Sequence, residues 1–425
     1  MPNNETSKYK IIFTDIQEKT ADNIAYFSNG REFIDWFFAN KNELKNTKLV
    51  FESKLTNISS DDIQSMYEFL KFYLKIKKSC NDGMNNYNNS LLNEDKNEEI
   101  KKAISEFVRM NDNGKFLRAT LVALGYQSMG NKDDNYLNLA LALELFQTSI
   151  LIHDDIIDNA VLRRGKETIP VSYNKHFNKE TEQKDFKQKR QKFSDSMAIC
   201  IGDLGFYLAN ELIVQGYKEN TNLGNILSYY HQTAIKTCKG EMIDIILPFK
   251  EEFFDTDPNL EEKIMEVYKL KTAWYSVIGP YCLGLTLGGM EEKNIKKIES
   301  ILLNVGIAFQ IKDDILGIYG DSNLLGKSTN SDIEEFKQTI LYSFAMQTKY
   351  QEELLKYYGK PNLTIENIEE VKTIFEKSGA KKYAEDTMNK LFIHSLSEID
   401  KDDSLNKEAK GILKGFIVYL QNRSK

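Results

Sequence analysis

Cysteine, histidine, tryptophan and proline are scarce in this chain of 425 residues, which has four cysteines, four histidines, two tryptophans and six prolines. The cysteines lie far apart and form no CxxC pair, so the sequence predicts neither a zinc site nor a disulfide framework. A reducing compartment is therefore the simplest interpretation. Because prolines are few, long unbroken helices are possible.

Several patterns that would indicate other classes of protein are also missing. The sequence shows no strand-like alternation, no repeat of fixed period and no glycine-rich phosphate loop. With 63 acidic and 56 basic residues the net charge is -7, which does not indicate a surface for nucleic acid. The first residues show no secretory signal, and the uncharged run Trp274–Met290 is short for a membrane span. We expect a cytoplasmic protein without a transmembrane segment.

Helical spacing of apolar residues organises most of the chain. It is continuous from Glu99 onward, so residues 99–425 are expected to form one all-α domain. Residues 1–78 contain shorter amphipathic stretches and are predicted to be an accessory helical region. Residues 79–98 are rich in Asn and Asp and are predicted to be a flexible linker. Residues 175–192 are polar and are predicted to be a solvated insertion or an exposed helix.

One apolar helix is expected to end in a cluster of acids. Residues 139–166 read LALALELFQTSILIHDDIIDNAVLRRGK, and Asp154 and Asp158 are four apart, which places both carboxylates on one helix face. Two like charges at this spacing repel by a few tenths of a kcal/mol. A cation between them is expected, and Mg²⁺ fits because it joins one or two carboxylates to substrate phosphates.

A second acidic pair, Asp313 and Asp314, also follows a long apolar stretch. Either cluster alone would more commonly be a solvated helix end. Two matching clusters instead favour two sides of one metal-filled cavity.

Five motifs together resemble the trans-isoprenyl diphosphate synthases. They are GKxxR at 114–118, DDIID at 154–158, RRG at 163–165, KT at 271–272 and FQxxDD at 309–314. The resemblance covers roughly residues 99–425. It implies a homodimer with the isoprenoid synthase-type helical bundle and a central active-site cavity, in which isopentenyl diphosphate is joined to an allylic diphosphate.

The resemblance implies three Mg²⁺ ions that bridge two aspartate-rich motifs to the allylic diphosphate. Such cations neutralise the charge that develops on the leaving diphosphate, and apolar walls keep water from the carbocation. Gly317 stands where many family members have a third aspartate in the second motif. The expected metal ligands are Asp154, Asp155, Asp158, Asp313 and Asp314.

Two groups of cations are expected to bind the two diphosphates, although a single cation is more often an ordinary surface charge. Lys115 and Arg118 can converge on one anion from the start of a helix. The resemblance assigns them, with Gln147 and Arg164, to isopentenyl diphosphate, and Asn113 replaces the first glycine of that motif. For the allylic diphosphate the resemblance implies Arg163, Lys271 and Lys327.

Two neutral polar residues, Thr272 and Gln310, resemble residues whose oxygens face the carbocation. With Lys271 and Arg163 they form the expected catalytic set. A buried polar pair that serves only helix packing is the competing interpretation. The released diphosphate is expected to take the proton, so no protein base is required.

Product length is expected to depend on residues one helical turn or more before Asp154. Ser149 and Ile150 lie five and four positions before it and leave no aromatic plug, while Phe146 lies deeper and could close the cavity or belong to the core. We expect a product longer than farnesyl, with geranylgeranyl favoured.

Two alternative functions stay open. A terpene cyclase of the same fold would ionise an allylic diphosphate without a second substrate, but it has no need of Lys115, Arg118 and Arg164. A non-catalytic regulatory subunit of a prenyl synthase is suggested by Gly317 and by the N-terminal extension, but not by the intact motifs.

Overall fold

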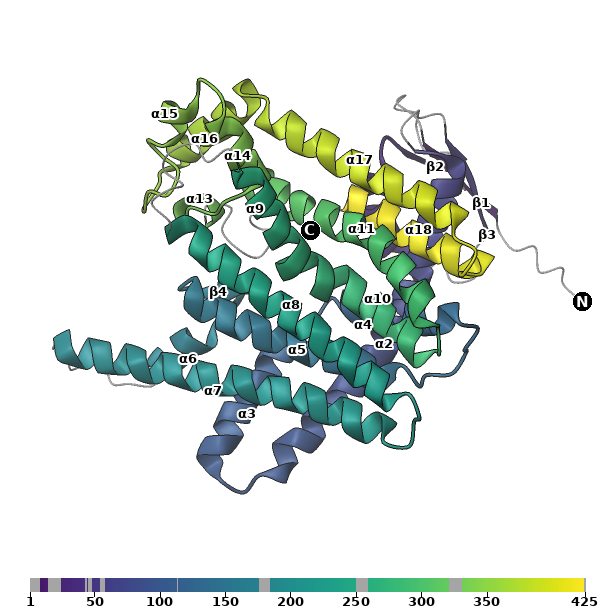
Figure 1. Ribbon diagram of the computed structural model, residues 1–425, viewed down its shortest axis with the longest axis horizontal. Helices are drawn as coiled ribbons and strands as arrows, with labels where there is room; N and C mark the ends of the chain where they lie inside the picture. The colour runs from purple at the N-terminus through teal and green to yellow at the C-terminus, as the bar shows by residue number, and fades with distance from the viewer. Residues whose placement is uncertain are drawn as a thin grey trace, which may run out of the picture.

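The computed structural model describes residues 8–13, 24–42, 44, 48–53, 58–112, 114–175, 184–249, 259–320 and 331–423. Helices make up most of them (Figure 1). The principal helices are α2 (Ser60–Glu94), α3 (Glu98–Asn111), α4 (Leu117–Ser128), α5 (Leu137–Ile157), α6 (Ile169–Lys175), α7 (Lys184–Tyr217), α8 (Leu223–Phe249), α9 (Leu260–Val267), η3 (Tyr268–Ile278), α10 (Gly279–Leu287), α11 (Glu292–Tyr319), α13 (Ser331–Glu334), α14 (Ile340–Met346), α15 (Gln351–Leu354), α16 (Ile365–Lys377), α17 (Ala380–Lys401) and α18 (Lys407–Asn422).

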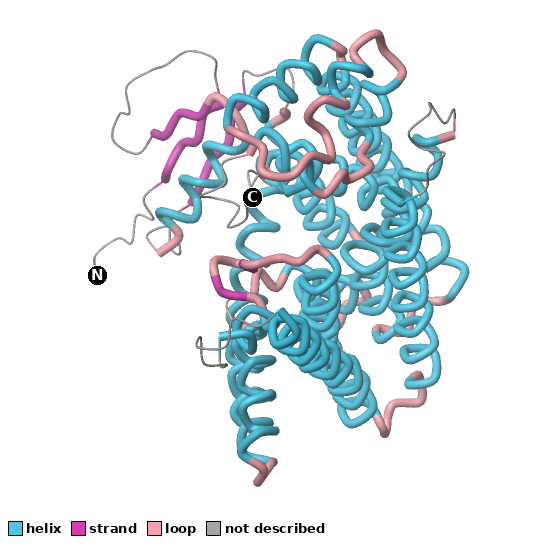
Figure 2. The backbone as a smooth tube through the Cα atoms, turned by 90° about the vertical axis from the view of Figure 1, so that its left-hand side faces the viewer, coloured by secondary structure: helices cyan, strands magenta, loops and turns pink. Residues whose placement is uncertain are grey.

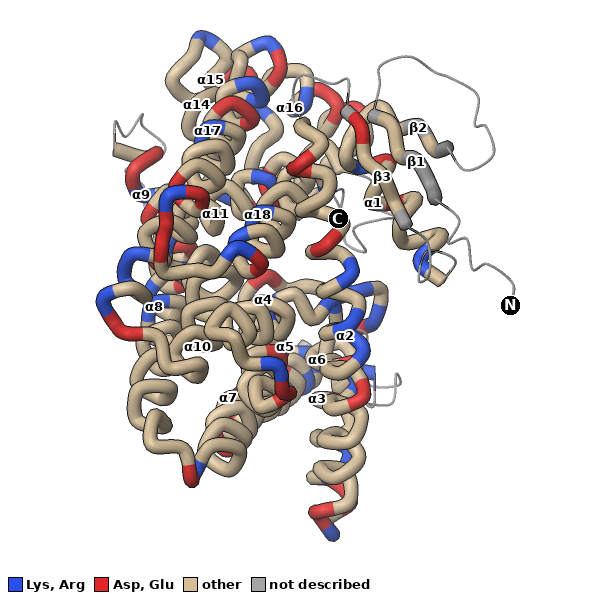
Figure 3. The backbone as a smooth tube through the Cα atoms, turned by 90° about the vertical axis from the view of Figure 1, so that its right-hand side faces the viewer, with Lys and Arg blue, Asp and Glu red and all other residues tan. Residues whose placement is uncertain are grey.

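The centre of the bundle is built from α4, α5, α10 and η3. Helix α5 packs along α7 and α4, α10 packs on α4, and η3 packs on α8 and α11. Helix α10 has no charged residue and is buried throughout (Figure 3), as a helix surrounded by other helices must be. The all-α fold predicted for this part of the chain is confirmed.

Glycines set how closely these helices approach. A Cβ atom on Gly125 would lie 2.1 Å from the Tyr281 carbonyl oxygen, and one on Gly284 would lie 2.1 Å from the Val122 carbonyl oxygen. Backbone therefore meets backbone where α4 crosses α10, which only glycine allows.

The predicted linker over residues 79–98 is wrong, because α2 continues as a helix to Glu94. The buried residues Cys80, Met84, Asn88 and Leu91 recur every three or four positions. This stripe faces the core while the Asn and Asp residues between them face outward. Composition alone concealed that periodicity.

The N-terminal region is not only helical. Strands β1 (Lys8–Phe13), β2 (Ile24–Phe27) and β3 (Lys48–Ser53) form a parallel sheet in the order β2-β1-β3, beside α1 (Gly30–Asn40) and at one side of the bundle (Figure 2). Neighbouring Ile11 and Ile12 are both buried. Parallel strands buried on both faces lose the alternating pattern, so no alternation marks these strands in the sequence.

The polar stretch 175–192 belongs in part to an exposed helix, since α7 begins at Lys184 and Lys187–Lys189 are exposed. Residues 176–183 of this prediction lie outside the described part of the chain. Within the described residues, one helix, Phe186–Tyr217, is long and apolar enough to cross a membrane by length and composition. Core helices of soluble bundles pass the same test, and this helix packs along α5 and α6.

Candidate active site

Toward its C-terminal end, α5 has a stripe of accessible residues on one face. Gln147, Ile150, Asp154 and Asp158 are partly or fully exposed, and they recur at the three- and four-residue spacing of one helix face. The shared face predicted for Asp154 and Asp158 is confirmed. A short hairpin of β4 (Leu162–Arg163) and β5 (Lys166–Glu167) follows the helix end.

Asp155 lies on another side of α5 and holds Arg163. Its Oδ1 accepts hydrogen bonds from the Arg163 Nε at 2.7 Å and Nη2 at 2.6 Å. Its Oδ2 is buried without a hydrogen-bond partner among the described residues. Burial raises the pKa of Asp155 to about 6 although Arg163 opposes the shift.

Lys271 neutralises the acids that face it from α5 and α8. Its Nζ lies 2.6 Å from Asp244 Oδ2 and 2.9 Å from Glu241 Oε2. Burial lowers the pKa of Lys271, but Asp244, Asp154 and Glu241 outweigh burial and raise it. Burial has the opposite effect on an acid and raises the pKa of Asp154 to about 6, although the positive charge of Lys271 lowers it. Lys271 and Thr272 lie in η3, a π-helix, and such helices are frequent at functional sites.

The two aspartates of the second motif point to different partners. Asp314 is buried, and its carboxylate accepts hydrogen bonds from the Tyr268 hydroxyl and, at 2.8 Å, from Gln310 Nε2. Asp313 is partly exposed and pairs with Arg423.

Arg423 and Tyr268 contact the second acidic motif, and the sequence analysis identified neither of them. The Arg423 guanidinium also lies 4.4 Å from the centre of the Phe309 ring. Arg423 follows the end of α18 and is 110 positions from its partner Asp313 in the sequence. No spacing pattern could reveal that pair. Tyr268, one helical turn before Lys271, had a positional signal, but its apolar ring suggested a core residue.

Lys337 brings the two acidic motifs into one electrostatic group. Asp332 makes the largest contribution to raising the pKa of Lys337, burial lowers it, and Asp314, Asp244 and Asp158 raise it further. A single ammonium group therefore interacts with acids from α5, α8, α11 and α13. This supports the prediction that the two acidic helix ends face each other.

Thr272 and Gln310 form the predicted polar pair beside these acids. The Thr272 hydroxyl donates to Gln310 Oε1 at 2.5 Å, and the Gln310 amide in turn donates to Asp314. The chain of hydrogen bonds fixes the direction of both dipoles.

The start of α4 forms a separate cationic group. The Arg118 Nη2 donates to the Ser276 hydroxyl at 2.7 Å, and its guanidinium lies 4.2 Å from the centre of the Tyr275 ring. The carbonyl of Lys115 accepts a hydrogen bond from the Tyr73 hydroxyl of α2 at 2.7 Å. The region predicted to be accessory therefore supports this predicted binding loop.

A buried acid, Glu144, holds the start of α4 in place. Phe116 precedes the helix with φ 54° and gives it no side-chain cap, and Glu144 Oε1 instead accepts from the Ala119 amide at 3.1 Å. Burial raises the pKa of Glu144, while Arg118, the Ala119 amide and Arg164 lower it. Sequence reasoning passed over Glu144 because it lies within an apolar run.

The predicted site residue Lys327 lies outside the described residues, as does Asn113, which replaces the first glycine of the motif around Lys115. His153 lies against α7, with Nε2 3.4 Å from Asp203 Oδ1, and so faces away from Asp154 and Asp158.

The predicted chain-length residues divide between two sides of α5. Ile150 lies on the accessible stripe, whereas Ser149 is fully buried with its hydroxyl against Gly205 of α7. The ring centre of Phe146 is 5.4 Å from that of Phe206 and 5.7 Å from that of Tyr230.

The residues present fit Mg²⁺ only together with an anion. Within the described residues no group of three or more His, Cys, Asp or Glu side chains is arranged to hold a metal by itself. Mg²⁺ commonly takes one or two carboxylates and completes its coordination with water and phosphate. Asp154 and Asp158 supply oxygens of that kind, whereas the predicted ligand Asp155 is buried on another side of α5 and pairs with Arg163.

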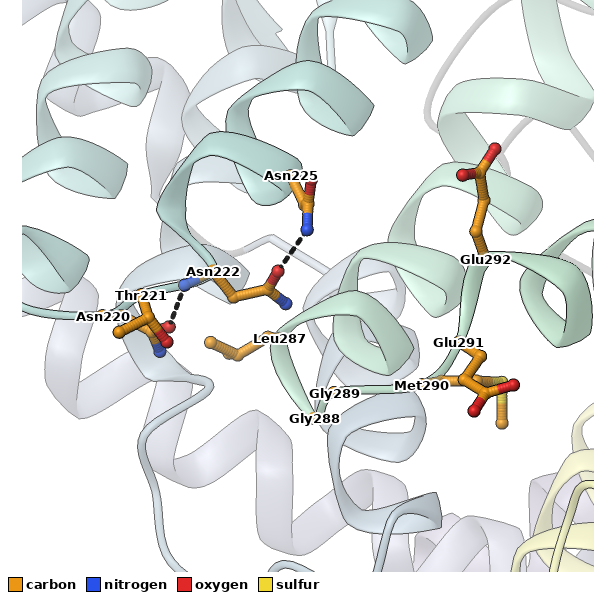
Figure 4. Close-up of a pocket in the computed structure, with 10 residues that line it drawn as sticks. All are labelled: Asn220, Thr221, Asn222, Asn225, Leu287, Gly288, Gly289, Met290, Glu291 and Glu292. Carbon is orange, nitrogen blue, oxygen red and sulfur yellow. Dashed lines mark hydrogen bonds between the residues drawn. The ribbon is translucent and has the colours of Figure 1, made fainter.

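A hollow of about 510 Å³ lies elsewhere, between Asn220–Asn225 and Leu287–Glu292 (Figure 4). Its asparagines bond one another, as in the 2.6 Å hydrogen bond from Asn225 Nδ2 to Asn222 Oδ1. It flanks the start of α8, about 30 Å along the helix from Asp244. This hollow is not part of the site.

Comparisons with known proteins agree on one family. A family model described as polyprenyl synthetase matches residues 97–377. A geranylgeranyl diphosphate synthase of Saccharolobus solfataricus is 30% identical over 73% of this chain and 87% of its own. A farnesyl pyrophosphate synthase of Candida albicans is 28% identical over 76% of this chain and 91% of its own length. The crystal structure of a Corynebacterium glutamicum geranylgeranyl pyrophosphate synthase, complexed with isoprenyl diphosphate and magnesium, superposes with a TM-score of 0.67 at 22% identity, covering 85% of this chain and 98% of that one.

Replacing Asp154 by Asn should stabilise the metal-free protein at pH 8 and have little effect at pH 4. The folded-state pKa of Asp154 is about 6 against an ordinary value of 3.8. Ionisation of this group therefore destabilises the folded state above pH 6, and the destabilisation disappears as the pH falls through 6 toward 4. We expect the free energy of unfolding in urea to rise by roughly 1–2 kcal/mol at pH 8.

The control is Asp386→Asn, which removes an exposed acid of α17. A gain for Asp154→Asn that is equal at both pH values, or larger at pH 4, would contradict the assignment of a buried, destabilised carboxylate.

Proposed function

Since this chain belongs to the polyprenyl synthetase family and is a prenyltransferase, we propose that it joins isopentenyl diphosphate to an allylic diphosphate in a reaction that needs Mg²⁺. One observation carries the proposal. A cluster of acids neutralised by Lys271 and Lys337 is separate from a cationic group at the start of α4. Two diphosphates with different requirements for metal match these two environments.

At the acidic cluster the chain binds the allylic diphosphate. Three Mg²⁺ ions, when bound, would supply Lewis-acid neutralisation of the leaving group. Asp154 and Asp158 lie on the accessible stripe to hold them, and Asp313 does so once Arg423 releases it. The ammonium groups of Lys271 and Lys337 and the guanidinium of Arg163 donate to diphosphate oxygens, joined by the predicted Lys327.

The polar pair and the apolar walls guide the allylic carbocation. Thr272 and Gln310 present fixed dipoles that stabilise positive charge without forming a bond to it. Buried residues of α5 and α10 exclude water that would capture it.

Isopentenyl diphosphate binds at the start of α4 without metal. Lys115, Arg118 and Arg164 donate to its oxygens, with Gln147 on the facing stripe of α5. Glu144 keeps this cationic group in position. After the new bond forms, the released diphosphate accepts the proton.

A product of geranylgeranyl length or longer is proposed because the accessible stripe of α5 has no aromatic residue between Asp154 and Gln147. Ile150 is the residue that a growing chain passes first, and Phe146 packs with Phe206 and Tyr230 to one side.

The assay combines the purified chain, Mg²⁺, labelled isopentenyl diphosphate and, separately, dimethylallyl, geranyl and farnesyl diphosphates. We expect all-trans products up to geranylgeranyl or longer. Lys271→Gln should lower turnover by about 100-fold or more, because a cation aimed at the developing charge is lost.

The matched control for Lys271→Gln is Lys269→Gln, two residues earlier in the chain. It breaks a solvent-accessible ion pair with Glu266 and should leave turnover unchanged. Lack of incorporation with every primer would contradict the function and favour a regulatory subunit. Release of a hydrocarbon from the primer alone would favour a cyclase.

We also propose a homodimer that forms through α7 and α8. The outer faces of these helices carry large exposed apolar residues, which are unusual on a monomer surface. They are Ile199, Tyr207, Ile235, Met242 and Ile246.

Light scattering should therefore give twice the chain mass of 49.1 kDa. Tyr207→Glu with Met242→Glu should give monomers, because two charges enter the apolar face. Ile365→Glu, at the equally exposed start of α16, should not. A monomeric wild-type protein would contradict the proposal.

A further inference from the structure

The second acidic motif on α11 lacks a side chain at its last position. Asp313 and Asp314 are followed by Gly317, one turn further along the same helix. Asp314 is already bonded by Tyr268 and Gln310, and Asp313 is paired with Arg423. Helix α11 by itself therefore offers few carboxylate oxygens to a cation.

A carboxylate from another helix occupies the space above Gly317. Asp332 lies on α13, and a Cβ atom on Gly317 would be 2.2 Å from its Oδ2 and 3.2 Å from its Cγ. Only 4% of Asp332 is exposed. The carboxylate of Asp332 thus fills the space that a side chain at position 317 would need.

The charge contacts of Asp332 place it in the acidic cluster around Lys337. The Nζ of Lys337 lies 4.0 Å from Asp332 Oδ1 and 3.8 Å from Asp314 Oδ1. The same ammonium group interacts with Asp158 and Asp244, which come from the opposite side. Asp332 is therefore near the place where Mg²⁺ and the allylic diphosphate are proposed to bind.

Resting on the proposed function, we propose that Asp332 supplies, from α13, the carboxylate that the second motif lacks at Gly317, and that it holds Mg²⁺ or a metal-bound water beside Asp313. When the cation binds there, the ammonium group of Lys337 is released from Asp332 and turns to the diphosphate. Glycine at 317 is then a requirement, because any side chain would collide with Asp332.

A purely structural role for Asp332 would be to neutralise the buried Lys337. Moving the carboxylate separates the two roles. In the double variant Gly317→Asp with Asp332→Ala, the acid returns to α11 and the collision is removed.

The experiment measures, by calorimetry, how the binding of inorganic pyrophosphate to the full-length protein depends on Mg²⁺ concentration. Asp332→Asn should raise the Mg²⁺ concentration for half-maximal binding about tenfold, as loss of a metal-supporting carboxylate does. The double variant should return to within about threefold of the wild type. Asp402→Asn, which removes a buried acid paired with Lys297 at 3.0 Å, should not change it.

An unchanged Mg²⁺ dependence for Asp332→Asn would overturn the proposal. So would a double variant that binds no better than Asp332→Asn, since that result leaves only the role of neutralising Lys337. If Asp332→Asn fails to fold, comparing Gly317→Asp/Asp332→Ala with Gly317→Ala/Asp332→Ala answers the same question. Because binding needs no turnover, a wild-type protein that binds pyrophosphate with Mg²⁺ but elongates no primer would refute only the proposed function.

Discussion

Repulsion among carboxylates is the constraint on which the rest of this structure depends. Acids from α5, α8, α11 and α13 converge in one buried region, where ionised groups that lack partners are strongly destabilising. Lys271 and Lys337 lie between them and make the arrangement stable without metal. The helices can therefore pack into a closed bundle that keeps its acidic ends facing each other. In the proposed reaction these lysines are also the groups that a metal–diphosphate complex would free to bind phosphate.

The two cationic regions differ in how they are held, and this separates their roles. Lys271 and Lys337 contact acids that suit Mg²⁺, so the binding of metal and the release of these ammonium groups are coupled. Arg118 instead lies on Tyr275 and bonds a neutral hydroxyl, with only the buried Glu144 nearby. An anion can bind there without any metal. The proposed condensation needs this difference, because the allylic substrate loses its diphosphate whereas isopentenyl diphosphate keeps its own.

Sequence reasoning predicted the parts of the site that follow helical spacing. The Asp154–Asp158 face, the Thr272–Gln310 pair and the facing acidic motifs all derive from local patterns or motifs. Arg423, Tyr73 and Asp332 were missed because each reaches the site from a distant segment, and no local period records such a contact. The strands of the N-terminal region and the helix across 79–94 were missed for a related reason, since composition hid which face of each element is buried.

Calorimetric titration of the wild-type protein with Mg²⁺, in the absence and presence of inorganic pyrophosphate, tests the central claim most directly. If lysines neutralise the acids at rest, Mg²⁺ alone must displace ammonium groups that have no other partner. Pyrophosphate gives them one, so Mg²⁺ should bind at least about tenfold more tightly in its presence, a coupling of about 1.4 kcal/mol. Equal Mg²⁺ affinity with and without pyrophosphate would contradict this account.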